Sequence, residues 1–579
     1  MENNNKLQNM RHTLAHLLAS AILELYPDTK NTIGPAIDDG FYYDFEFSSP
    51  ISDKDLPKIE KKMRENLKSW KEFTSEEKSA NEAKEYFGNN EYKVELINEI
   101  EEKGEKITFY TCGKFTDLCR GGHSENPKEE ISSDSFKLDR VAGAYWRGDE
   151  KNKMLTRIYG LAFNTKEELD IFINQREEAR KRDHKKLGKD LDLFTFSELV
   201  GSGLPLWTPK GTMMRILLDD FVWSLREKHG YQKVEIPHIT KKDLYETSGH
   251  WDKYKDDLFR ITTREEHEFA MKPMNCPHHT QIYARKAWSY KELPQRYANT
   301  TMCYRDEQSG ELAGLSRVRA FAQDDAHVFC RISQAKEEIQ KIWEIVHTFY
   351  GAFGLKLKLR LSLRDPEHPE KYLGDKEHWD KAEKVLKEIA QENKTEYFEA
   401  PGEAAFYAPK LDFMAEDSIG REWQVATIQL DVNMPNRFDL TCTNEKGERE
   451  RIVMVHAAIM GSIERFMSII IEHFAGAFPT WLSPVQVAIV PVRENHSEEA
   501  KKIYDMLKEN NIRVELADSD ESLGKRINHA KSQKVPYVIV LGDKEVESKM
   551  LTIEGRESKT EMNALDFLAK LKEEIQNKK

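Results

Sequence analysis

Two short clusters in the middle of the chain combine residue types that can bind metal ions or charged substrates. The first, over residues 271–279, places Cys276 in a proline-punctuated turn next to two histidines. The second ends in Gln323, Asp325 and His327, which alternate along an expected strand and therefore share one of its faces. A strand that presents an amide, a carboxylate and an imidazole on one face is unusual for a protein core. Each cluster also has an ordinary explanation: a packed thiol for the first and a half-exposed strand for the second.

A third cluster adds a histidine and an arginine. His456 lies in an apolar run, and Arg465 follows Gly461 and Ser462, a pair that can cap a helix. Taken alone, this pattern is best explained by an ordinary helix start with an exposed arginine. The evidence for a site therefore comes from the three clusters together.

A further pair of patterns lies nearer the start of the chain. His12 and His16 are four residues apart, on one face of an expected helix. Cys119 and His123 repeat that spacing later in the same region. Either pair alone is weak evidence, but the combination is a stronger signal. One interpretation of the four side chains is a tetrahedral zinc site.

The elements that carry the middle clusters indicate a mixed fold. Expected helices over residues 212–228, 333–353 and 456–474 occur together with short β-type runs such as 425–430. That mixture favours an α+β domain with an antiparallel sheet.

The two ends of the chain differ from the middle. Residues 1–165 combine an amphipathic opening helix, strands and turns over 34–45, and an acidic helical stretch over 53–102. The last zone alternates strand and helix, which predicts a small domain with a parallel sheet. Its expected strands are 485–492, 512–517 and 535–541, and its expected helices are 497–510 and 523–533.

A charged segment separates the first zone from the middle. Residues 166–189 are helical in pattern, and the part from 176 to 186 contains six Lys or Arg. We interpret this segment as a solvated linker helix, with contact to phosphate as the less favoured alternative. The predicted domains are therefore 1–165, a linker over 166–190, 191–483 and 484–579.

Length and composition limit the class of protein. The chain has 579 residues, and domains usually contain roughly 100–200, so three or four are expected. Hydrophobic residues make up 39% and charged residues 33%, which fits a protein with several buried cores. The net charge of -13 does not exclude a nucleic-acid partner, because phosphate binding depends on local Lys and Arg patches.

The sequence indicates neither secretion nor insertion into a membrane. Its start is polar and rich in asparagine, unlike a signal peptide, and no apolar run approaches the ~20 residues that cross a bilayer. The six irregularly spaced cysteines do not form a disulfide framework. We therefore expect a cytoplasmic protein.

Together, the clusters resemble motifs of the class II aminoacyl-tRNA synthetases. Arg305 and Glu307 match the second signature motif of that class, and residues 461–465 match the third. Pro237, after Val-Glu-Ile, matches the proline of the first motif, which lies at the dimer interface in the class. Within the class, Lys-Pro-Met-Asn-Cys-Pro, Gln-Asp-Asp-Ala-His and Gly-Ser-Ile-Glu-Arg-Phe resemble the threonyl-tRNA synthetase family, and the resemblance covers essentially the whole chain.

The resemblance implies a fold and a reaction. It implies an α+β multidomain protein with a class II antiparallel-sheet catalytic core over 191–483. An α+β editing domain over 1–165 and an α/β anticodon-binding domain over 484–579 would flank that core. The implied reaction is that of a threonine–tRNA ligase, which activates L-threonine with ATP and transfers it to the 3′ end of tRNA(Thr), releasing AMP and diphosphate. A homodimer is implied by the first motif.

The family's roles also assign residues to ATP. Arg305 would bind the α-phosphate and Arg465 the γ-phosphate, which places fixed positive charge around the transition state. Glu307 would accept a hydrogen bond from the adenine amino group, Phe321 would stack on the ring, and Mg²⁺ would bridge the phosphates. The remaining assignments are Gln424 and Thr427 near the nucleotide, Tyr407 and Gln429 in the threonine pocket, and Gln323, Asp325 and Lys410 as pocket residues that also take part in catalysis.

The family also implies a metal site that selects the amino acid. Cys276, His327 and His456 supply a thiolate and two imidazoles, which suit zinc, and three protein ligands leave room for a substrate. In the family, the amino and hydroxyl groups of threonine complete the coordination, and Asp325 would pair with the amine. Valine lacks the hydroxyl and is rejected, whereas serine lacks only one methyl, worth ~1–3 kcal/mol. Serine should therefore be activated as well. A second selection step (a second sieve) is then needed to remove serine after it has been attached to the tRNA.

The two spaced pairs near the start of the chain would provide that sieve. The same four residue types bind zinc in the related alanyl-type editing domains, but in the threonyl family they belong to a metal-free hydrolytic cleft. We follow the family and expect hydrolysis of seryl-tRNA(Thr) without a metal. The residues of this expected site are His12, His16, Cys119 and His123, with Asp117 and Tyr43 nearby.

The last zone resembles the anticodon-binding domain that the threonyl, prolyl, histidyl and glycyl synthetases share. Residues 535–545 carry that resemblance, and Lys525, Arg526 and Glu545 are candidates for contact with the anticodon. The family often has a ubiquitin-like domain before the editing domain. Only about ten residues precede His12, so we expect that domain to be absent.

Three other functions fit part of the pattern. A prolyl or seryl synthetase shares the class motifs, but neither the zinc ligands nor the two spaced pairs. A non-catalytic RNA-binding relative usually loses the motif arginines, whereas Arg305 and Arg465 are both present. A stand-alone hydrolase centred on His12 and Cys119 leaves the large middle region without a purpose.

Overall fold

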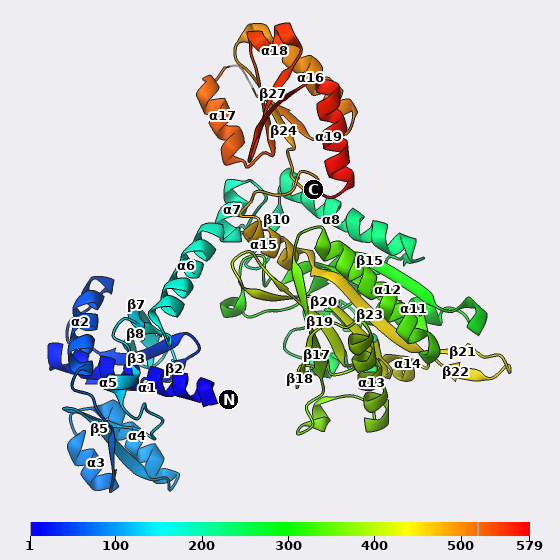
Figure 1. The fold of residues 1–579 in the computed structure, drawn as a ribbon. Coiled ribbons are helices and arrows are strands. Elements are labelled where there is room, and N and C mark those ends of the chain that lie inside the picture. The colour runs from blue at the N-terminus through cyan, green and yellow to red at the C-terminus, as the bar shows by residue number, and fades with distance from the viewer. Residues whose placement is uncertain (1, 518–519) are drawn as a thin grey trace. The chain divides into compact units, whose positions relative to one another are not determined.

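The computed structural model describes residues 2–517 and 520–579 and divides into two compact units, Met1–Glu177 and Glu178–Lys579 (Figure 1). The division falls within helix α6 (Lys166–Arg182), which confirms a helical segment where a linker is predicted. The four predicted domains and the three boundaries between them stay predictions. Within the described residues, every helix is too short or too polar to cross a bilayer.

The first unit is built around helix α1 and a five-stranded sheet. The strands β1, β3, β8 and β7 are neighbours in that order, and β2 pairs with β3. Leu14, Leu18 and Ile22 of α1 are fully buried, as is Phe41 of β3. The elements are α1 (Glu2–Leu25), β1 (Lys30–Asn31), β2 (Ala36–Ile37), β3 (Gly40–Glu46), α2 (Leu56–Leu67), α5 (Pro127–Glu130), β7 (Phe136–Tyr145) and β8 (Met154–Ala162).

Two expectations for this unit need correction. Helix α1 is not amphipathic along its centre, because Arg11, Thr13 and His16 are buried together with its apolar residues. The stretch 53–102 is not helical throughout, because β4 (Thr74–Lys78) interrupts it and pairs with β5 (Ile107–Cys112). Pairing with a distant strand decides the conformation of this polar segment, and no local pattern reveals it. The three-stranded sheet β4–β5–β6 also includes β6 (Phe115–Leu118), and the helices beside it are α3 (Ala80–Tyr86) and α4 (Glu91–Glu102).

The second unit contains an eight-stranded sheet in the order β11-β15-β16-β23-β20-β19-β17-β18. All pairs from β15 to β17 are antiparallel, which confirms the antiparallel sheet predicted for the middle of the chain. Only the two outer pairs, β11–β15 and β17–β18, are parallel. The strands are β11 (Gln232–Lys233), β15 (Gln295–Tyr304), β16 (Ala320–Cys330), β17 (Lys356–Leu363), β18 (Tyr397–Pro401), β19 (Lys410–Glu416), β20 (Glu422–Asp431) and β23 (Val453–Ser462).

Helices cover this sheet and join its strands. Helix α12 (Ile332–Gly351) lies against β16, β17, β20 and β23, and Ile339, Val346 and Phe349 on it are fully buried. The remaining helices are α7 (His184–Asp190), α8 (Pro209–Lys228), α9 (Lys242–Ser248), α10 (His250–Lys253), α11 (Cys276–Ala284), α13 (Lys376–Glu392), α14 (Asn433–Arg437) and α15 (Ile463–His473). The small strands outside the large sheet are β9 (Phe194–Thr195), β10 (Leu206–Trp207), β12 (Ile239–Lys241), β13 (Arg260–Thr262), β14 (Glu268–Met271), β21 (Thr441–Thr443) and β22 (Arg449–Arg451).

The helix predicted over residues 456–474 is wrong in its first part. Residues 453–462 form β23, a central strand of the large sheet, and only Ile463–His473 is helical. A strand that is buried on both faces has a continuous apolar sequence, which periodicity alone does not separate from a buried helix. The correction matters because it puts His456 on the sheet rather than on a helix.

The last part of the chain confirms the predicted alternation and extends it. Strand β24 (Val487–Pro491) pairs in parallel with both β25 (Val514–Leu516) and β26 (Tyr537–Leu541). Two antiparallel strands that the sequence analysis missed, β27 (Leu551–Gly555) and β28 (Lys559–Met562), complete the five-stranded sheet. The helices are α16 (Ser497–Glu509), α17 (Leu523–Ser532), α18 (Asp543–Ser548) and α19 (Ala564–Gln576).

Candidate functional site

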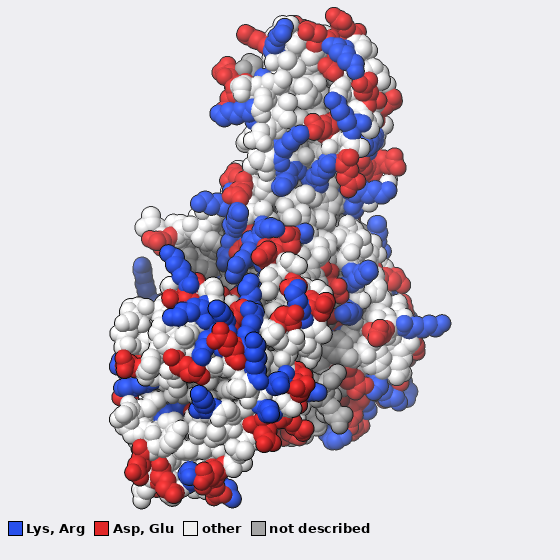
Figure 2. Space-filling view, turned by 60° about the vertical axis from the view of Figure 1, so that its left-hand side comes forward, with Lys and Arg blue, Asp and Glu red and all other residues white. Residues whose placement is uncertain are grey.

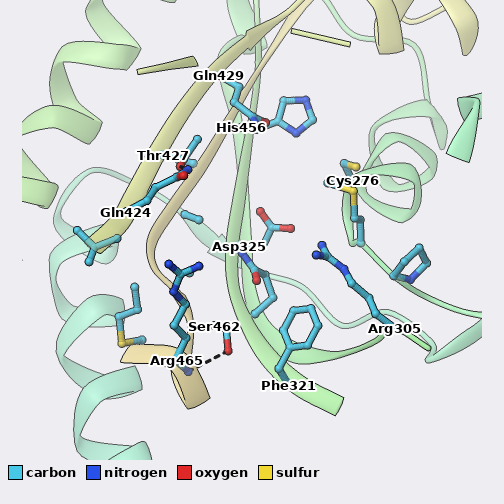
Figure 3. Close-up of a pocket in the computed structure, with 18 of the residues that line it drawn as sticks. Cys276, Arg305, Phe321, Asp325, Gln424, Thr427, Gln429, His456, Ser462 and Arg465 are labelled. Atoms are coloured by element: carbon cyan, nitrogen blue, oxygen red, sulfur yellow. Dashed lines mark hydrogen bonds between the residues drawn. The ribbon is translucent and has the colours of Figure 1, made fainter. Parts of the chain in front are cut away.

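A cavity of about 550 Å³ opens over the large sheet of the second unit. All fourteen residues that the sequence analysis assigned to the middle region line it, from four strands, helices α11 and α15 and the intervening loops. Figure 3 shows several of these side chains converging on one space. They are Cys276, Arg305, Glu307, Phe321, Gln323, Asp325, His327, Tyr407, Lys410, Gln424, Thr427, Gln429, His456 and Arg465.

The register of the sheet explains why distant residues meet. His327 of β16 pairs with His456 of β23, His456 pairs with Gln429 of β20, and Gln429 pairs with Lys410 of β19. Four site residues therefore form one row across four neighbouring strands. Directly paired residues lie on the same face of a sheet, so the pairing carries all four side chains to the cavity.

One end of the cavity holds a thiol and two imidazoles. One ligand atom each from Cys276, His327 and His456 lies within 4.8 Å of the others, and all three residues are buried. Nε2 of His327 is 3.1 Å from Nδ1 of His456, so these two nitrogens face each other. The other ring nitrogens are engaged elsewhere: Nδ1 of His327 is 2.7 Å from Nδ1 of His279, and Nε2 of His456 is 3.0 Å from Oδ2 of Asp431.

These three donors fit zinc. Burial raises the pKa of the Cys276 thiol well above its usual value and holds the pKa of His327 well below its own. A neutral imidazole keeps a lone pair for a metal, and a thiol gives up its proton when a dication binds. His279 and Asp431 hold the outer nitrogens of the two histidines, as the partners of metal-ligating histidines commonly do. Neither partner was predicted from the sequence.

A carboxylate stands next to the three donors. Oδ1 of Asp325 lies 3.6 Å from Nε2 of His327. Burial raises the pKa of Asp325 to about 6, because a negative charge is poorly solvated there. A bound cation such as a substrate ammonium group would favour the ionised carboxylate. Nearby, the Tyr407 hydroxyl donates a hydrogen bond of 2.8 Å to Oε1 of Gln429, which fixes both side chains.

Two arginines make the same cavity suited to an anion. Among the described residues, neither Arg305 nor Arg465 forms an ion pair with a carboxylate, although both line the cavity. The guanidinium of Arg305 lies 5.2 Å from the centre of the Phe321 ring. Arg465 stands in the first turn of α15, where the Ser462 hydroxyl accepts a hydrogen bond of 3.2 Å from its backbone N–H. Helix N-termini favour negative charge, so the two arginines and the N-terminus of α15 together indicate a phosphate-binding site.

A buried carboxylate that the sequence analysis missed organises two further site residues. Oδ1 of Asp412 accepts hydrogen bonds of 2.8 Å from both the Gln424 amide and the Thr427 hydroxyl. Its other oxygen is 3.0 Å from the guanidinium of Arg360 and 3.3 Å from Nζ of Lys410. Asp412 is fully buried, so this network fixes the positions of Gln424, Thr427 and Lys410.

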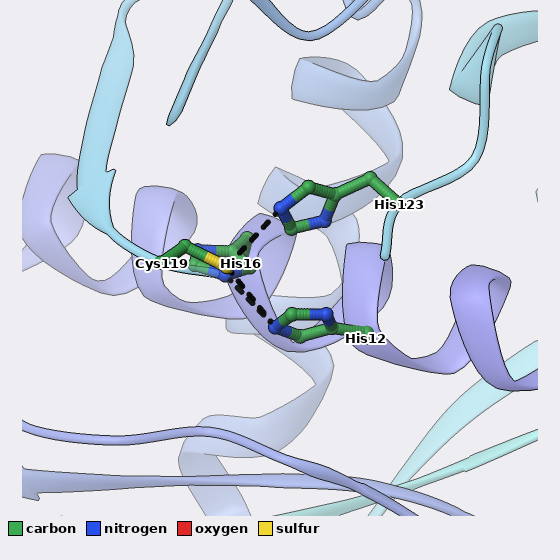
Figure 4. A group of neighbouring side chains, drawn as sticks. All are labelled: His12, His16, Cys119 and His123. Atoms are coloured by element: carbon green, nitrogen blue, oxygen red, sulfur yellow. Dashed lines mark hydrogen bonds between the residues drawn. The ribbon is translucent and has the colours of Figure 1, made fainter. Parts of the chain in front are cut away.

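The first unit contains a separate cluster, which Figure 4 shows. Sγ of Cys119 is 3.6 Å from Nε2 of His12 and 3.3 Å from Nε2 of His123. Nε2 of His12 is also 3.2 Å from Nε2 of His16. The structure thus brings all four predicted residues together. All but His123, which stacks on Phe73, line a cavity of about 380 Å³.

The electrostatics of this cluster favour a charged pair. Burial alone would raise the pKa of the Cys119 thiol, but hydrogen bonds with His12, His123 and His16 outweigh it and lower the pKa to about 3. Burial alone would lower the pKa of His16, but hydrogen bonds with Asp117 and Cys119 raise it to about 9. At neutral pH Cys119 is therefore a thiolate and His16 an imidazolium.

A buried network lies behind the charged pair. Oδ2 of Asp117 accepts a hydrogen bond of 2.6 Å from the Tyr43 hydroxyl and lies 3.3 Å from Nδ1 of His16. Its other oxygen is 2.5 Å from Nζ of Lys93, which is only 2% exposed. The predicted residues Asp117 and Tyr43 thus belong to the cluster. Lys93 was missed, because an isolated lysine in a helix carries no spacing signal.

The three candidates in the last part of the chain have different surroundings. Arg526 is buried, donates a hydrogen bond of 2.6 Å to the carbonyl of Pro491 and lines a cavity of about 560 Å³. Lys525 is exposed and pairs with Glu521. Glu545 accepts hydrogen bonds from the Gly542 N–H and the Thr552 hydroxyl, so its carboxylate is engaged within the domain.

Three family models match the chain. Residues 107–159 match the "Threonyl and Alanyl tRNA synthetase second additional domain". Residues 259–474 match the "tRNA synthetase class II core domain (G, H, P, S and T)", and residues 486–577 match the "Anticodon binding domain". The matches fall on the unit with the four-residue cluster, on the large sheet and on the final sheet, respectively.

Individual relatives cover nearly the whole chain. The threonine–tRNA ligase of Rubrobacter xylanophilus is 46% identical over 571 residues, which are 98% of this chain and 88% of the relative. The threonine–tRNA ligase of Oceanobacillus iheyensis is 45% identical over 584 residues, which are 100% of this chain and 90% of the relative.

Solved structures give the same picture. The RNA-binding domain of threonyl-tRNA synthetase from Cryptosporidium parvum superposes with a TM-score of 0.65 at 34% identity, over 68% of this chain and 98% of that one. The prolyl-tRNA synthetase of the same organism superposes with a TM-score of 0.54 at 16% identity, over 68% of this chain and 75% of that one, and shows the fold alone.

Proposed function

This chain belongs to the threonyl-tRNA synthetase family, and we propose that it is a threonine–tRNA ligase with two sieves. It activates L-threonine with ATP to threonyl-adenylate and transfers the threonyl group to the 3′ end of tRNA(Thr). The observation that carries the proposal is one cavity lined by two chemically different groups of side chains. Two arginines that form no ion pair with a carboxylate among the described residues line this cavity together with a thiol, two imidazoles and a carboxylate.

In the activation step, the chain's own residues orient ATP and stabilise developing charge. Arg305 binds the α-phosphate and Arg465 the γ-phosphate, from opposite sides of the cavity. Glu307 accepts from the adenine amino group and Phe321 stacks on the ring. Fixed positive charge in a preformed cavity lowers the barrier of phosphoryl chemistry because it needs little reorganisation. Mg²⁺ would accompany ATP, since its phosphate oxygens are the hard ligands that this ion prefers.

At the other end, Cys276, His327 and His456 would hold a zinc ion. That ion would supply positive charge and open positions for the amino and hydroxyl groups of threonine. Asp325 pairs with the substrate ammonium group, and Gln323, Tyr407, Gln429 and Lys410 surround the substrate. A site that requires a hydroxyl leaves a polar position unfilled when valine binds, so valine is rejected. Serine has the hydroxyl and is only weakly discriminated.

The cluster of the first unit would remove the resulting error. We propose that His12, His16, Cys119 and His123 hydrolyse seryl-tRNA(Thr) without a metal, with Asp117 holding His16 and Tyr43 holding Asp117. The charged pair of Cys119 and His16 is compatible with a metal-free site, because hydrogen bonds within the protein stabilise the thiolate without an ion. The same four atoms lie close enough to bind a metal ion, so metal content tests this part of the proposal.

The proposal also includes the partners and the compartment. The position of Pro237 in the first motif supports a homodimer. Binding of tRNA is compatible with the net charge of -13, because phosphate binding depends on local groups of Lys and Arg, and Figure 2 shows such groups among the Asp and Glu of one face. All six cysteines are free thiols, which agrees with a reducing compartment such as the cytoplasm.

Amino-acid-dependent exchange of pyrophosphate into ATP tests the central claim. We expect exchange with threonine, weaker exchange with serine and background exchange with valine. A zinc chelator should abolish the threonine-dependent signal, and added zinc should restore it. A chain that does not activate threonine, or that activates valine as well as serine, is not the enzyme proposed here.

A further inference from the structure

A histidine outside the cavity connects two of the elements that form it. His184 is the first residue of α7 and only 5% exposed. Its Nδ1 is 2.6 Å from Oε1 of Glu472, and its backbone N–H donates a hydrogen bond of 3.1 Å to the same oxygen. Because a carboxylate oxygen only accepts, Nδ1 carries the ring proton. Glu472 stands in the last turn of α15, the helix whose first turn carries Arg465.

The opposite nitrogen of the same ring holds a loop. Nε2 of His184 is unprotonated in this tautomer and accepts a hydrogen bond of 3.0 Å from the backbone N–H of Leu315. Leu315 is fully buried, so its N–H has no access to water as a substitute partner. It lies in the loop 305–319, which joins β15 to β16 and begins at Arg305.

The residue before Leu315 is shaped for this contact. Gly314 has a positive φ of 54°, and a Cβ built on it would lie 2.3 Å from Nε2 of His184. A side chain at this position would therefore strain the backbone and displace the imidazole. The close approach of loop and ring depends on glycine.

The residues after Leu315 lead directly to the cavity. The Ser316 hydroxyl is 2.9 Å from that of Ser468, which lies one turn before Glu472 on α15. Arg317 then donates a hydrogen bond of 2.8 Å to Glu307, the residue proposed to accept from adenine. The returning arm of the loop is thus fixed to α15 twice, through Ser316 and through His184.

We propose that His184 is a positioning residue for ATP. It ties the loop 305–319 to α15, so that Glu307 on the loop and Arg465 on the helix keep the separation that the adenine and the γ-phosphate require. The inference rests on the proposed ligase function and adds to it a contribution from α7, which follows the first unit in the chain. His184 touches neither substrate, so it acts only through Leu315 and Glu472.

His184 and Glu472, together with the neighbouring Asp183, do not make a cation site. Asp183, His184 and Glu472 have ligand atoms within 4.8 Å of one another. However, both ring nitrogens of His184 are engaged in hydrogen bonds, and Oε2 of Glu472 pairs with Arg421 at 2.6 Å. The geometry is that of a completed hydrogen-bond network.

Two substitutions of His184 separate its two contacts. His184→Asn places an amide where Nδ1 stands, so it keeps the bond to Glu472 and loses the acceptor for Leu315. His184→Gln reaches further and can offer Oε1 to the Leu315 N–H. One lost hydrogen bond corresponds to roughly a three- to tenfold change in an equilibrium constant. We expect His184→Asn to weaken binding of a non-hydrolysable ATP analogue by that factor, and His184→Gln to restore most of it.

Hydrogen exchange of the intact protein distinguishes a local effect of His184 on the loop 305–319 from a general effect on the fold. In His184→Asn, the peptide containing Leu315 should exchange faster, whereas peptides of α12 and α13 should not change. Gly314→Ala should reproduce both effects from the loop side, and His229→Asn, at the end of α8, is the matched control. Unchanged affinity for the analogue in both His184→Asn and Gly314→Ala overturns the proposal.

Different results refute the proposed role of His184 and the proposed ligase function. Binding of the analogue does not require activation of threonine. An absence of threonine-dependent pyrophosphate exchange in the unmodified chain therefore refutes the proposed function alone. A general loss of protection throughout the chain in both variants would show that His184 maintains the fold rather than the loop, and would also overturn the proposal.

Discussion

Asp431 holds the imidazole of His456 from the side opposite His327. Its Oδ2 lies 3.0 Å from Nε2 of His456, while its Oδ1 accepts backbone hydrogen bonds of 2.7 and 3.0 Å from Asn433 and Met434. The carboxylate is thus fixed at the end of β20, and its second oxygen can only accept. The ring proton of His456 must therefore lie on Nε2, which leaves Nδ1 free to face Cys276 and His327.

Asp431→Asn is expected to weaken zinc binding about 10- to 100-fold. The backbone donors keep the oxygen of the new amide in place, so the NH₂ group faces Nε2 of His456 and forces the ring proton onto Nδ1. That nitrogen can then no longer bind a metal ion. Titration with a chelating dye measures the affinity, and Asp439→Asn, at an exposed ion pair, is the control. Equal affinity in both variants would show that Asp431 does not set the tautomer.

Arg465→Ala is expected to lower kcat for pyrophosphate exchange by about 10²–10³ with little change in the KM for threonine. The arginine lies at the phosphate end of the cavity, away from the thiol and imidazoles, so its loss removes charge stabilisation and leaves the amino-acid end intact. Arg449→Ala removes an exposed arginine that pairs with Asp439 and serves as the control. A large rise in the KM for threonine would show that Arg465 contributes to binding of the amino acid rather than of ATP.

The sequence predicts the middle site well because its residues occur in short, dense strings. The fourteen assigned residues all line one cavity, although the sequence predicts a helix for the strand that carries His456. Spacing along the chain does not show that His327, His456 and Gln429 are neighbours. The register of β16, β23 and β20 in the structure shows it.

The supporting residues were not predictable in the same way. Asp412, Asp431 and Lys93 are single charged residues without a pattern around them, and each acts on a partner that is distant in sequence or on another strand. Burial gives them their importance, because an ionised group inside a protein must be paired. Burial of a particular charged side chain follows from the packing of several elements. Asp431 is the last residue of β20, in which polar and apolar residues alternate, and this is the one local signal that could have marked it.

His12→Ala is expected to slow hydrolysis of seryl-tRNA(Thr) by about 10²–10⁴ and to leave threonine activation unchanged. The histidine lines the cavity of the first unit, whereas the activation site lies in the second. Deacylation of seryl-tRNA and pyrophosphate exchange are measured on the same preparations, with His267→Ala as an exposed control. A parallel loss of both activities would contradict two separate sieves.

The amount of bound zinc tests whether only the cluster of Cys276, His327 and His456 holds a metal ion. The proposal requires one zinc ion per chain, held by Cys276, His327 and His456. Cys276→Ser should therefore leave the protein without stoichiometric zinc, because the cluster around Cys119 binds none. Native mass spectrometry and metal analysis give the stoichiometry. One equivalent of zinc remaining in Cys276→Ser would refute the metal-free editing site.

The charged pair of Cys119 and His16 predicts opposite pH dependences for two substitutions. His16 has a folded-state pKa raised from 6.5 to about 9, so its stabilisation is complete below pH 6.5 and is lost as pH rises toward 9. Cys119 has a folded-state pKa lowered from 9.0 to about 3, so its stabilisation grows as pH rises over the same range. The two contributions cancel between pH 6.5 and 9, because the folded pair and the unfolded chain then bind the same number of protons.

Removing one partner should expose the contribution of the other. In Cys119→Ser, Asp117 still raises the pKa of His16, so the local stability of α1 should fall with pH by at most about 1.4 kcal/mol per unit. In His16→Asn, hydrogen bonds from His12 and His123 still lower the pKa of Cys119, so the stability should rise with pH by a similar amount. Hydrogen exchange of α1 amides between pH 6.5 and 9, corrected for intrinsic rates, measures both slopes against the flat profile of the unmodified chain. Slopes of the same sign in the two variants would mean that the thiolate and the imidazolium do not form one pair.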